Sequence, residues 1–141
     1  MSISRVSVHL TVREVVLDNL ALHTRTGNSP TALVVEDNDD LRELVCDVLK
    51  DAGYATCGIA TAEEGIQLLQ YGNFDVMIVD VCLPGMSGLE LVGKARQIDP
   101  GIKVILATGQ GISSQLEQKL GFNLLKKPYS ISDLQNALTE A

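Results

Sequence analysis

Two acidic positions, one hydroxyl and one lysine could together transfer a phosphoryl group. Glu36-Asp37 and Asp80 each follow a short apolar run, and Thr108 and Lys127 lie at the ends of two later apolar runs. Carboxylates that lie close together repel one another, so a cluster of them is costly unless a cation joins it. Hard carboxylate oxygens suit Mg²⁺, which keeps part of its water shell and favours phosphate as a further ligand.

Phosphoryl transfer needs a nucleophile, a metal that neutralises charge, and fixed donors to the oxygens of the transferred group. Asp80 can be the nucleophile, since carboxylates form acyl phosphates. Glu36 and Asp37 can hold the metal, and the Thr108 hydroxyl and the Lys127 ammonium can hold phosphoryl oxygens. Taken singly, Glu36-Asp37 are also typical of a solvated turn, Thr108 of a strand end and Lys127 of a surface charge. Asp80 is harder to explain in this way, because an acid that ends a buried strand is costly without a partner. The prediction rests on the joint placement of these residues.

Short apolar runs that alternate with amphipathic stretches predict the elements that position these residues. The expected strands are Thr31–Val35, Tyr54–Gly58, Phe74–Val79, Ile102–Ala107 and Phe122–Leu125. Helices are expected after Asn38, from Thr61, over residues 88–97, over residues 111–119 and from Ser130 to the C-terminus. The first of them carries an apolar stripe made of Leu41, Leu44, Val45, Val48 and Leu49.

The order of strand and helix, repeated five times, predicts an α/β fold. We expect a doubly wound (βα)5, flavodoxin-like arrangement with a five-stranded parallel sheet covered by helices on both faces. In such folds, ligands bind beyond the carboxyl ends of the strands. The residues named above all follow the carboxyl ends of expected strands, so they should meet at one edge of the sheet.

Four stretches of the chain resemble the response-regulator receiver family, the CheY-like domains of two-component signalling. They are ALVVEDND (32–39), FDVMIVDVCLPGMSGLEL (74–91), VILATG (104–109) and KKPYSISDL (126–134), and they occur in family order. The resemblance covers about residues 31–141. It implies a phosphoacceptor switch, not an enzyme, that uses Mg²⁺ and takes its phosphoryl group from a histidine kinase or a phosphotransfer protein.

The resemblance also implies roles for single residues near the metal. Asp80 matches the phosphoacceptor and a metal ligand, and Asp37 matches a direct Mg²⁺ ligand beside it. Glu36 matches a residue that binds Mg²⁺ through water, and Cys82 matches the residue that supplies its backbone carbonyl.

Further along the chain, the resemblance holds at the phosphate-binding residues and fails at one neighbouring position. Thr108 matches the family's switch hydroxyl, and Lys127, directly before Pro128, matches the phosphate-binding lysine, which Lys126 does not. Leu124 stands where the family usually has an aromatic side chain. The stretch between Thr108 and Lys127 is also about one helical turn short. We therefore expect the surface that commonly docks partners to be altered.

Composition and charge narrow the expected partners and location. The formal net charge of -7 argues against nucleic acid as a direct partner. No apolar run approaches the roughly 20 residues that cross a membrane, and no secretory signal is recognisable, so we expect a cytoplasmic protein without membrane partners. The three cysteines form no CxxC motif, so disulfides are not expected, and Cys46 and Cys57 should be small buried residues.

Residues 1–30 lie outside the family pattern and end in a turn-rich run, Thr26–Pro30. They are expected to form an N-terminal extension before a receiver domain at residues 31–141. A dimerisation arm, a remnant of a longer architecture and a flexible leader are alternative interpretations, of which we favour the last.

The chain ends with its last expected helix, so we expect a stand-alone receiver that signals through contact with a downstream protein. A phosphate sink and a receiver fragment of a hybrid histidine kinase are alternatives. An aspartyl-phosphate phosphatase is disfavoured because Asp80-Val81-Cys82 lacks the second acid of a D-x-D motif. A purely structural module is disfavoured by the intact set of site residues. A flavodoxin-like cofactor binder is disfavoured because no phosphate loop follows the first strand.

Overall fold

The computed structural model describes residues 29–109 and 123–140 of the 141-residue chain. Its five strands form one parallel sheet in the order β2-β1-β3-β4-β5. Their bounds are Thr31–Val35 (β1), Ala55–Ile59 (β2), Val76–Asp80 (β3), Lys103–Thr108 (β4) and Asn123–Lys126 (β5). Because β1 lies between β2 and β3, the chain winds first toward one edge and then toward the other. The predicted doubly wound parallel sheet is therefore confirmed.

The helices of the described part are Asp39–Asp51 (α2), Ala62–Tyr71 (α3), Gly88–Ile98 (α4) and Ile131–Glu140 (α6). A side-chain oxygen of the preceding residue caps the first three, at Asn38, Thr61 and Ser87. Ser130 and Asp133 exchange two hydrogen bonds of 3.0 Å in a capping box that begins α6. None of these helices has the length and apolarity that a membrane crossing requires.

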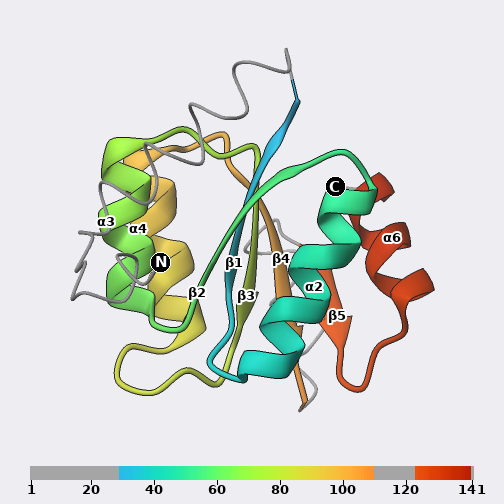
Figure 1. Cartoon of the computed structure of the whole chain (residues 1–141). Helices are drawn as coiled ribbons and strands as arrows, with labels where there is room; N and C mark the ends of the chain where they lie inside the picture. Colours follow the sequence, from blue (N-terminus) through green and yellow to red (C-terminus); the bar gives the residue numbers. More distant parts are fainter. Residues whose placement is uncertain (1–28, 110–122, 141) are drawn as a thin grey trace, which may run out of the picture.

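Two apolar layers cover the sheet. Figure 1 shows α3 and α4 on one face and α2 and α6 on the other. The first layer packs on strand side chains such as Leu33 and Met77, and the second on their neighbours Val34 and Ile78. Successive side chains of a strand point to opposite faces, so each strand contributes to both layers. Because both faces of the sheet are covered by apolar side chains, polar functional groups are expected at the ends of the strands.

Most predicted strand bounds differ from the observed ones by one or two residues. The apolar stripe expected on the first helix was wrong at Leu44, which is 49% exposed, whereas Val45, Val48 and Leu49 are buried. At about 100° per residue, Leu44 lies roughly 40° outside the arc that these three define, so it points away from the sheet. The helix expected at 111–119 and residue Phe122 lie outside the described residues.

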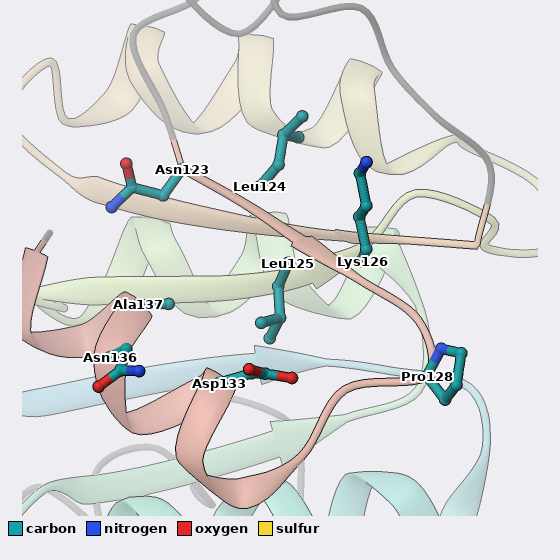
Figure 2. Close-up of a pocket in the computed structure, with 8 residues that line it drawn as sticks. All are labelled: Asn123, Leu124, Leu125, Lys126, Pro128, Asp133, Asn136 and Ala137. Carbon is teal, nitrogen blue, oxygen red and sulfur yellow. The ribbon is translucent and has the colours of Figure 1, made fainter.

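Strand β5 is an edge strand of the sheet and carries Leu124, which stands where the receiver family usually has an aromatic side chain. Figure 2 shows Leu124 and Lys126 on one side of β5, and Leu125 on the side that faces α6. Leu124 packs against the layer of α3 and α4, whereas Leu125 belongs to the layer of α2 and α6. Between β5 and α6 lies a pocket of ≈ 410 Å³.

Candidate functional site

The parallel strands bring the predicted site residues to one edge of the sheet. Asp80 is the last residue of β3, and Thr108 is the last residue of the adjacent β4. Lys127 follows β5, and its backbone N–H donates a hydrogen bond of 2.8 Å to the Thr108 carbonyl. Glu36 and Asp37 follow β1, which is the other neighbour of β3. Residues from four strands thus surround the end of β3.

Three carboxylates form the centre of this edge. One oxygen each of Glu36, Asp37 and Asp80 can be chosen so that all lie within 4.8 Å of one another. Glu36 is 4% and Asp80 6% exposed, whereas Asp37 is open to solvent. Two buried carboxylates at this separation repel each other and need a cation between them. A further cation can reach this group from solvent on the side of the exposed Asp37.

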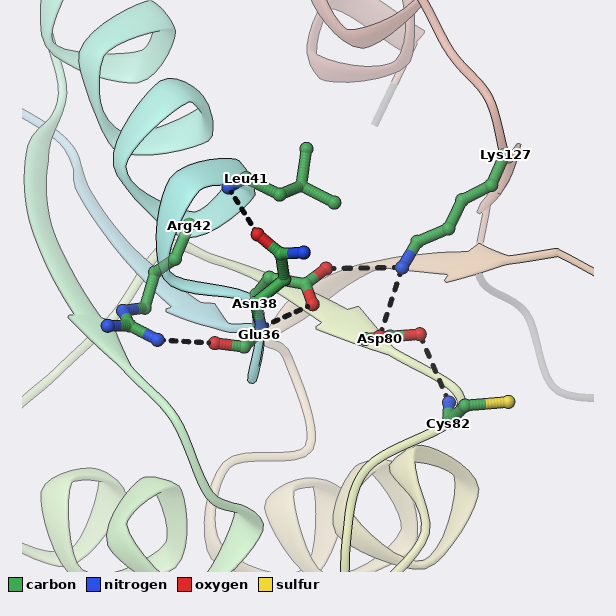
Figure 3. A network of polar contacts seen from close by, with 7 residues as sticks. All are labelled: Glu36, Asn38, Leu41, Arg42, Asp80, Cys82 and Lys127. Carbon is green, nitrogen blue, oxygen red and sulfur yellow. Dashed lines mark hydrogen bonds and ion pairs between the residues drawn. The ribbon is translucent and has the colours of Figure 1, made fainter.

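The ammonium of Lys127 lies between the two buried carboxylates, as Figure 3 shows. It donates hydrogen bonds to Asp80 Oδ2 at 3.0 Å and to Glu36 Oε1 at 3.2 Å. The neighbouring Lys126 is exposed and points to the opposite side of β5 from α6 (Figure 2). Lys127, and not Lys126, therefore reaches the acidic group.

Burial and neighbouring charges raise the pKa values of two groups in this cluster. Burial raises the pKa of Glu36 above its ordinary 4.5, and the Asp80 carboxylate adds to the rise, although the Asn38 N–H and Lys127 oppose it. Burial alone would lower the pKa of Lys127, but its hydrogen bond to Asp80 and the charge of Glu36 outweigh burial and raise it. Lys127 therefore stays charged at neutral pH.

The loop after β3 holds Asp80 from its other side. The N–H of Cys82, whose side chain is exposed, donates to Asp80 Oδ1 at 3.1 Å. Gly88 begins α4 so close to this loop that a Cβ atom there would lie 2.3 Å from the Asp80 carbonyl oxygen. Sequence reasoning gives Gly88 no role beyond starting the helix expected over residues 88–97. A glycine at the first position of an otherwise ordinary helix is the signal that could have revealed this contact.

Arg42 is a site residue that sequence reasoning missed. Its Nη1 donates to the backbone carbonyl of Glu36 at 2.8 Å, and its Nη2 pairs with Asp39 Oδ1 at 2.6 Å. Asp39 lies in the acidic first turn of α2 and also anchors the Arg42 guanidinium. The signal in the sequence is a cation near a helix N-terminus, where the helix dipole disfavours positive charge.

Tyr129 is a second residue without a predicted role. It follows the cis peptide bond between Lys127 and Pro128 and, with them and Leu41, lines a pocket of ≈ 350 Å³ beside the acidic group. Burial raises the pKa of Tyr129 to about 12, and the charge of Glu36 contributes to the rise. The phenol therefore stays protonated at neutral pH and adds no charge to the site.

This arrangement fits a hard divalent cation. Among residues 29–109 and 123–140, its three carboxylates face one nearby ammonium, that of Lys127, so an excess of negative charge remains beside the solvent. All the side-chain donors are oxygens, which suit Mg²⁺. Asp80 is a carboxylate held by a cation and by a backbone N–H, which is the setting of a nucleophile in phosphoryl transfer.

Comparison with known proteins places these features in a family. A family model described as "Response regulator receiver domain" matches residues 32–139. The chain is 28% identical over 109 residues to the response regulator receiver protein CpdR of Brucella abortus, covering 75% of this chain and 91% of CpdR. It is 30% identical over 122 residues to the sensor kinase CckA of the same species, covering 83% of this chain and 13% of CckA.

Solved structures share the fold. A CheY-like response regulator receiver domain protein of Methanospirillum hungatei has a TM-score of 0.74 and 29% identity, over 80% of this chain and 93% of that chain. The response regulator TrrA of Thermotoga maritima, in complex with Mg(2+)-BeF, has a TM-score of 0.71 and 29% identity, over 79% of this chain and 97% of that chain.

Proposed function

Because the chain belongs to the response regulator receiver domain family of two-component signalling, we propose that it accepts a phosphoryl group on Asp80. The observation that carries the proposal is the setting of this carboxylate, which ends β3 buried, with one oxygen bonded to Lys127 and the other to the Cys82 N–H. A carboxylate oxygen attacks the phosphorus of a phosphohistidine, the bond from phosphorus to nitrogen breaks, and the released imidazole takes up a proton.

Lys127 and Thr108 bind the transferred group. The Lys127 ammonium lies 3.0 Å from Asp80 Oδ2, where it neutralises charge on a phosphoryl oxygen. Thr108 ends the adjacent strand and supplies its hydroxyl to another oxygen. The group later leaves to water or to a further acceptor, so the chain acts as a switch with no turnover of a separate substrate.

Glu36, Asp37 and Asp80 would hold Mg²⁺, with the backbone carbonyl of Cys82 as a further ligand. The support for this is the close approach of the three carboxylates and the excess negative charge that Lys127 leaves. When bound, Mg²⁺ neutralises the charge that the phosphoryl oxygens carry during transfer. We assign a direct contact to Asp37 and a contact through water to Glu36.

The partners follow from this chemistry. A histidine kinase or a phosphotransfer protein donates the phosphoryl group in the cytoplasm, and a downstream protein reads the phosphorylated surface. The formal net charge of -7 supports a protein partner and disfavours nucleic acid, which binds chains through clustered Lys and Arg.

The test is Mg²⁺-dependent labelling by acetyl phosphate, with the modified residue mapped by mass spectrometry. Asp80→Asn should abolish the label. Asp37→Asn should raise the half-saturating Mg²⁺ concentration at least about tenfold, because a charged ligand is lost. Asp47→Asn, the same change on the exposed surface of α2, is the matched control and should behave as the unmodified chain. Undiminished labelling of Asp80→Asn would contradict the assignment.

A further inference from the structure

We propose that Arg42 is a positioning residue that orients the metal ligands of the loop between β1 and α2. The inference rests on the proposed function, because it concerns how Mg²⁺ is held at Glu36 and Asp37. Arg42 lies in the first turns of α2, and its side chain folds back along the loop toward the end of β1, as Figure 3 shows.

The guanidinium fixes the peptide unit that precedes Asp37. Its Nη1 donates a hydrogen bond of 2.8 Å to the Glu36 carbonyl oxygen, which belongs to the peptide bond between Glu36 and Asp37. The N–H of Glu36 donates to the Ile59 carbonyl at the end of β2 at 3.0 Å. Glu36 is thus held at both of its backbone groups. Because the peptide unit is planar, holding the carbonyl also sets the direction of the chain at Asp37.

Asp37 depends on its backbone more than the other two carboxylates do. Glu36 and Asp80 each accept one hydrogen bond from Lys127 and another from a backbone N–H. Within residues 29–109 and 123–140, no hydrogen bond or ion pair holds the Asp37 carboxylate, yet its oxygen lies within 4.8 Å of the others. The preceding peptide unit therefore sets the direction in which the Asp37 side chain leaves the backbone toward the other two carboxylates.

Arg42 is itself held on two sides. Its Nη2 pairs with Asp39 Oδ1 at 2.6 Å, and its side chain is 22% exposed. Its stem runs over Gly58 of β2, where a Cβ atom would lie 3.2 Å from Arg42 Cγ. The glycine leaves room for the stem, and Asp39 offsets part of the positive charge near a cation site.

Two ways in which Arg42 could act predict opposite effects on Mg²⁺ affinity. If only its charge mattered, removing it would tighten Mg²⁺ binding a few-fold, because like charges repel. If it orients the ligands, removing it weakens binding, as loss of an outer contact to a metal ligand does, by about tenfold or more. Whether Mg²⁺ affinity rises or falls when Arg42 is replaced therefore distinguishes the charge effect from the orienting effect.

The experiment titrates the full chain with MgCl₂ by calorimetry. Arg42→Met keeps the stem over Gly58 and removes the donors, and we expect about tenfold weaker binding. Arg42→Lys keeps the charge and a single donor nitrogen but lacks the two-pronged guanidinium, so it should recover part of the affinity. Lys50→Met removes the same charge in the last turn of α2 and is the matched control, with affinity expected within about twofold of the unmodified chain.

A second measurement does not depend on metal. In NMR spectra recorded without Mg²⁺, Arg42→Met should move the amide resonance of Asp37, whose peptide unit loses its hydrogen bond, and leave the core amides unchanged. Equal or tighter Mg²⁺ binding by Arg42→Met would overturn the inference about Arg42 alone, provided that the unmodified chain binds. Failure of the unmodified chain to bind Mg²⁺ would overturn the proposed metal site together with this inference.

Discussion

At the scale of single residues, the Lys127 ammonium offsets part of the negative charge of the acids around it. The ammonium bonds to both Glu36 and Asp80, and its raised pKa keeps it charged at neutral pH. A bound Mg²⁺ would also offset the negative charge of these carboxylates. The lysine therefore holds the two acids together when no metal is bound. In the function that we propose, it also binds phosphoryl oxygens after transfer.

Lys127→Met should lower the free energy of unfolding by about 2 kcal/mol in the absence of Mg²⁺, because two buried carboxylates lose their shared cation. The deficit should shrink as Mg²⁺ is added, since the metal replaces the lost charge. Urea unfolding followed by circular dichroism measures both effects. Lys126→Met is the matched control, because Lys126 is exposed, and should change stability by less than about 0.5 kcal/mol. Equal losses in the two variants would refute the role of Lys127.

Tyr129 should ionise near pH 12, because burial and the charge of Glu36 raise its pKa to about 12. A raised pKa in the folded state means that the unfolded chain loses this proton first, so stability falls as pH rises above the ordinary value of 10. Tyr129→Phe should remove this part of the alkaline loss and the late step in tyrosinate absorbance. The same late step in Tyr129→Phe would assign it to another tyrosine.

At the scale of elements, the starts of helices decide how closely the site can assemble. Helix α4 begins against the backbone of Asp80, and α2 begins in the loop that carries the other two acids. A side chain that changes the backbone path of either first turn should therefore displace the carboxylates of the site.

Gly88→Ala should destabilise the protein by about 2–3 kcal/mol, because its Cβ would overlap the Asp80 carbonyl oxygen and push α4 outward. Phosphorylation should slow as well, since the displaced backbone carries Asp80. Gly93→Ala, in the same helix, meets no atom within 4 Å and should stabilise by about 0.5–1 kcal/mol. Thermal unfolding of both variants tests the contrast. A Gly88→Ala variant that is as stable as Gly93→Ala, or more stable, would contradict the steric account.

The elements themselves were predictable because strands buried on both faces appear in the sequence as apolar runs, as at residues 76–79 of β3. Their shared edge followed from the rule for parallel sheets. The contacts within the site could not be predicted in the same way. The bond from Lys127 to Glu36 spans 91 residues, and the reach of Arg42 back to the Glu36 carbonyl depends on the direction of one side chain. Periodicity carries no information about either contact.

At the scale of the whole molecule, the sheet separates the site from the start of its first strand. The site lies at the carboxyl ends of the strands, whereas Thr31 begins β1 at the opposite end. Thr31 is anchored there by described residues, since its N–H donates to Asp75 Oδ2 at 2.7 Å and its hydroxyl to the Asn73 carbonyl at 2.8 Å. The first strand is therefore tied to the start of β3 from within the domain.

Deleting residues 1–28 should leave folding and phosphorylation intact, because the anchors of β1 remain. We expect a melting temperature within about 4 °C of the full chain and cooperative unfolding. The rate of labelling by acetyl phosphate should also be unchanged. Loss of cooperative unfolding, or a folded protein that no longer takes the label, would show that the extension belongs to the domain.

The exposed thiol of Cys82 has a practical consequence for watching the protein work. Cys57 is buried and Cys46 half-buried, so a thiol-reactive dye should attach first at Cys82. The backbone N–H of Cys82 donates a hydrogen bond to the carboxylate of Asp80. The chain contains no tryptophan, so its own emission is weak and a dye would be read against little background. The protein thus carries a natural attachment point for a fluorescent reporter, two residues from the event that the reporter would follow.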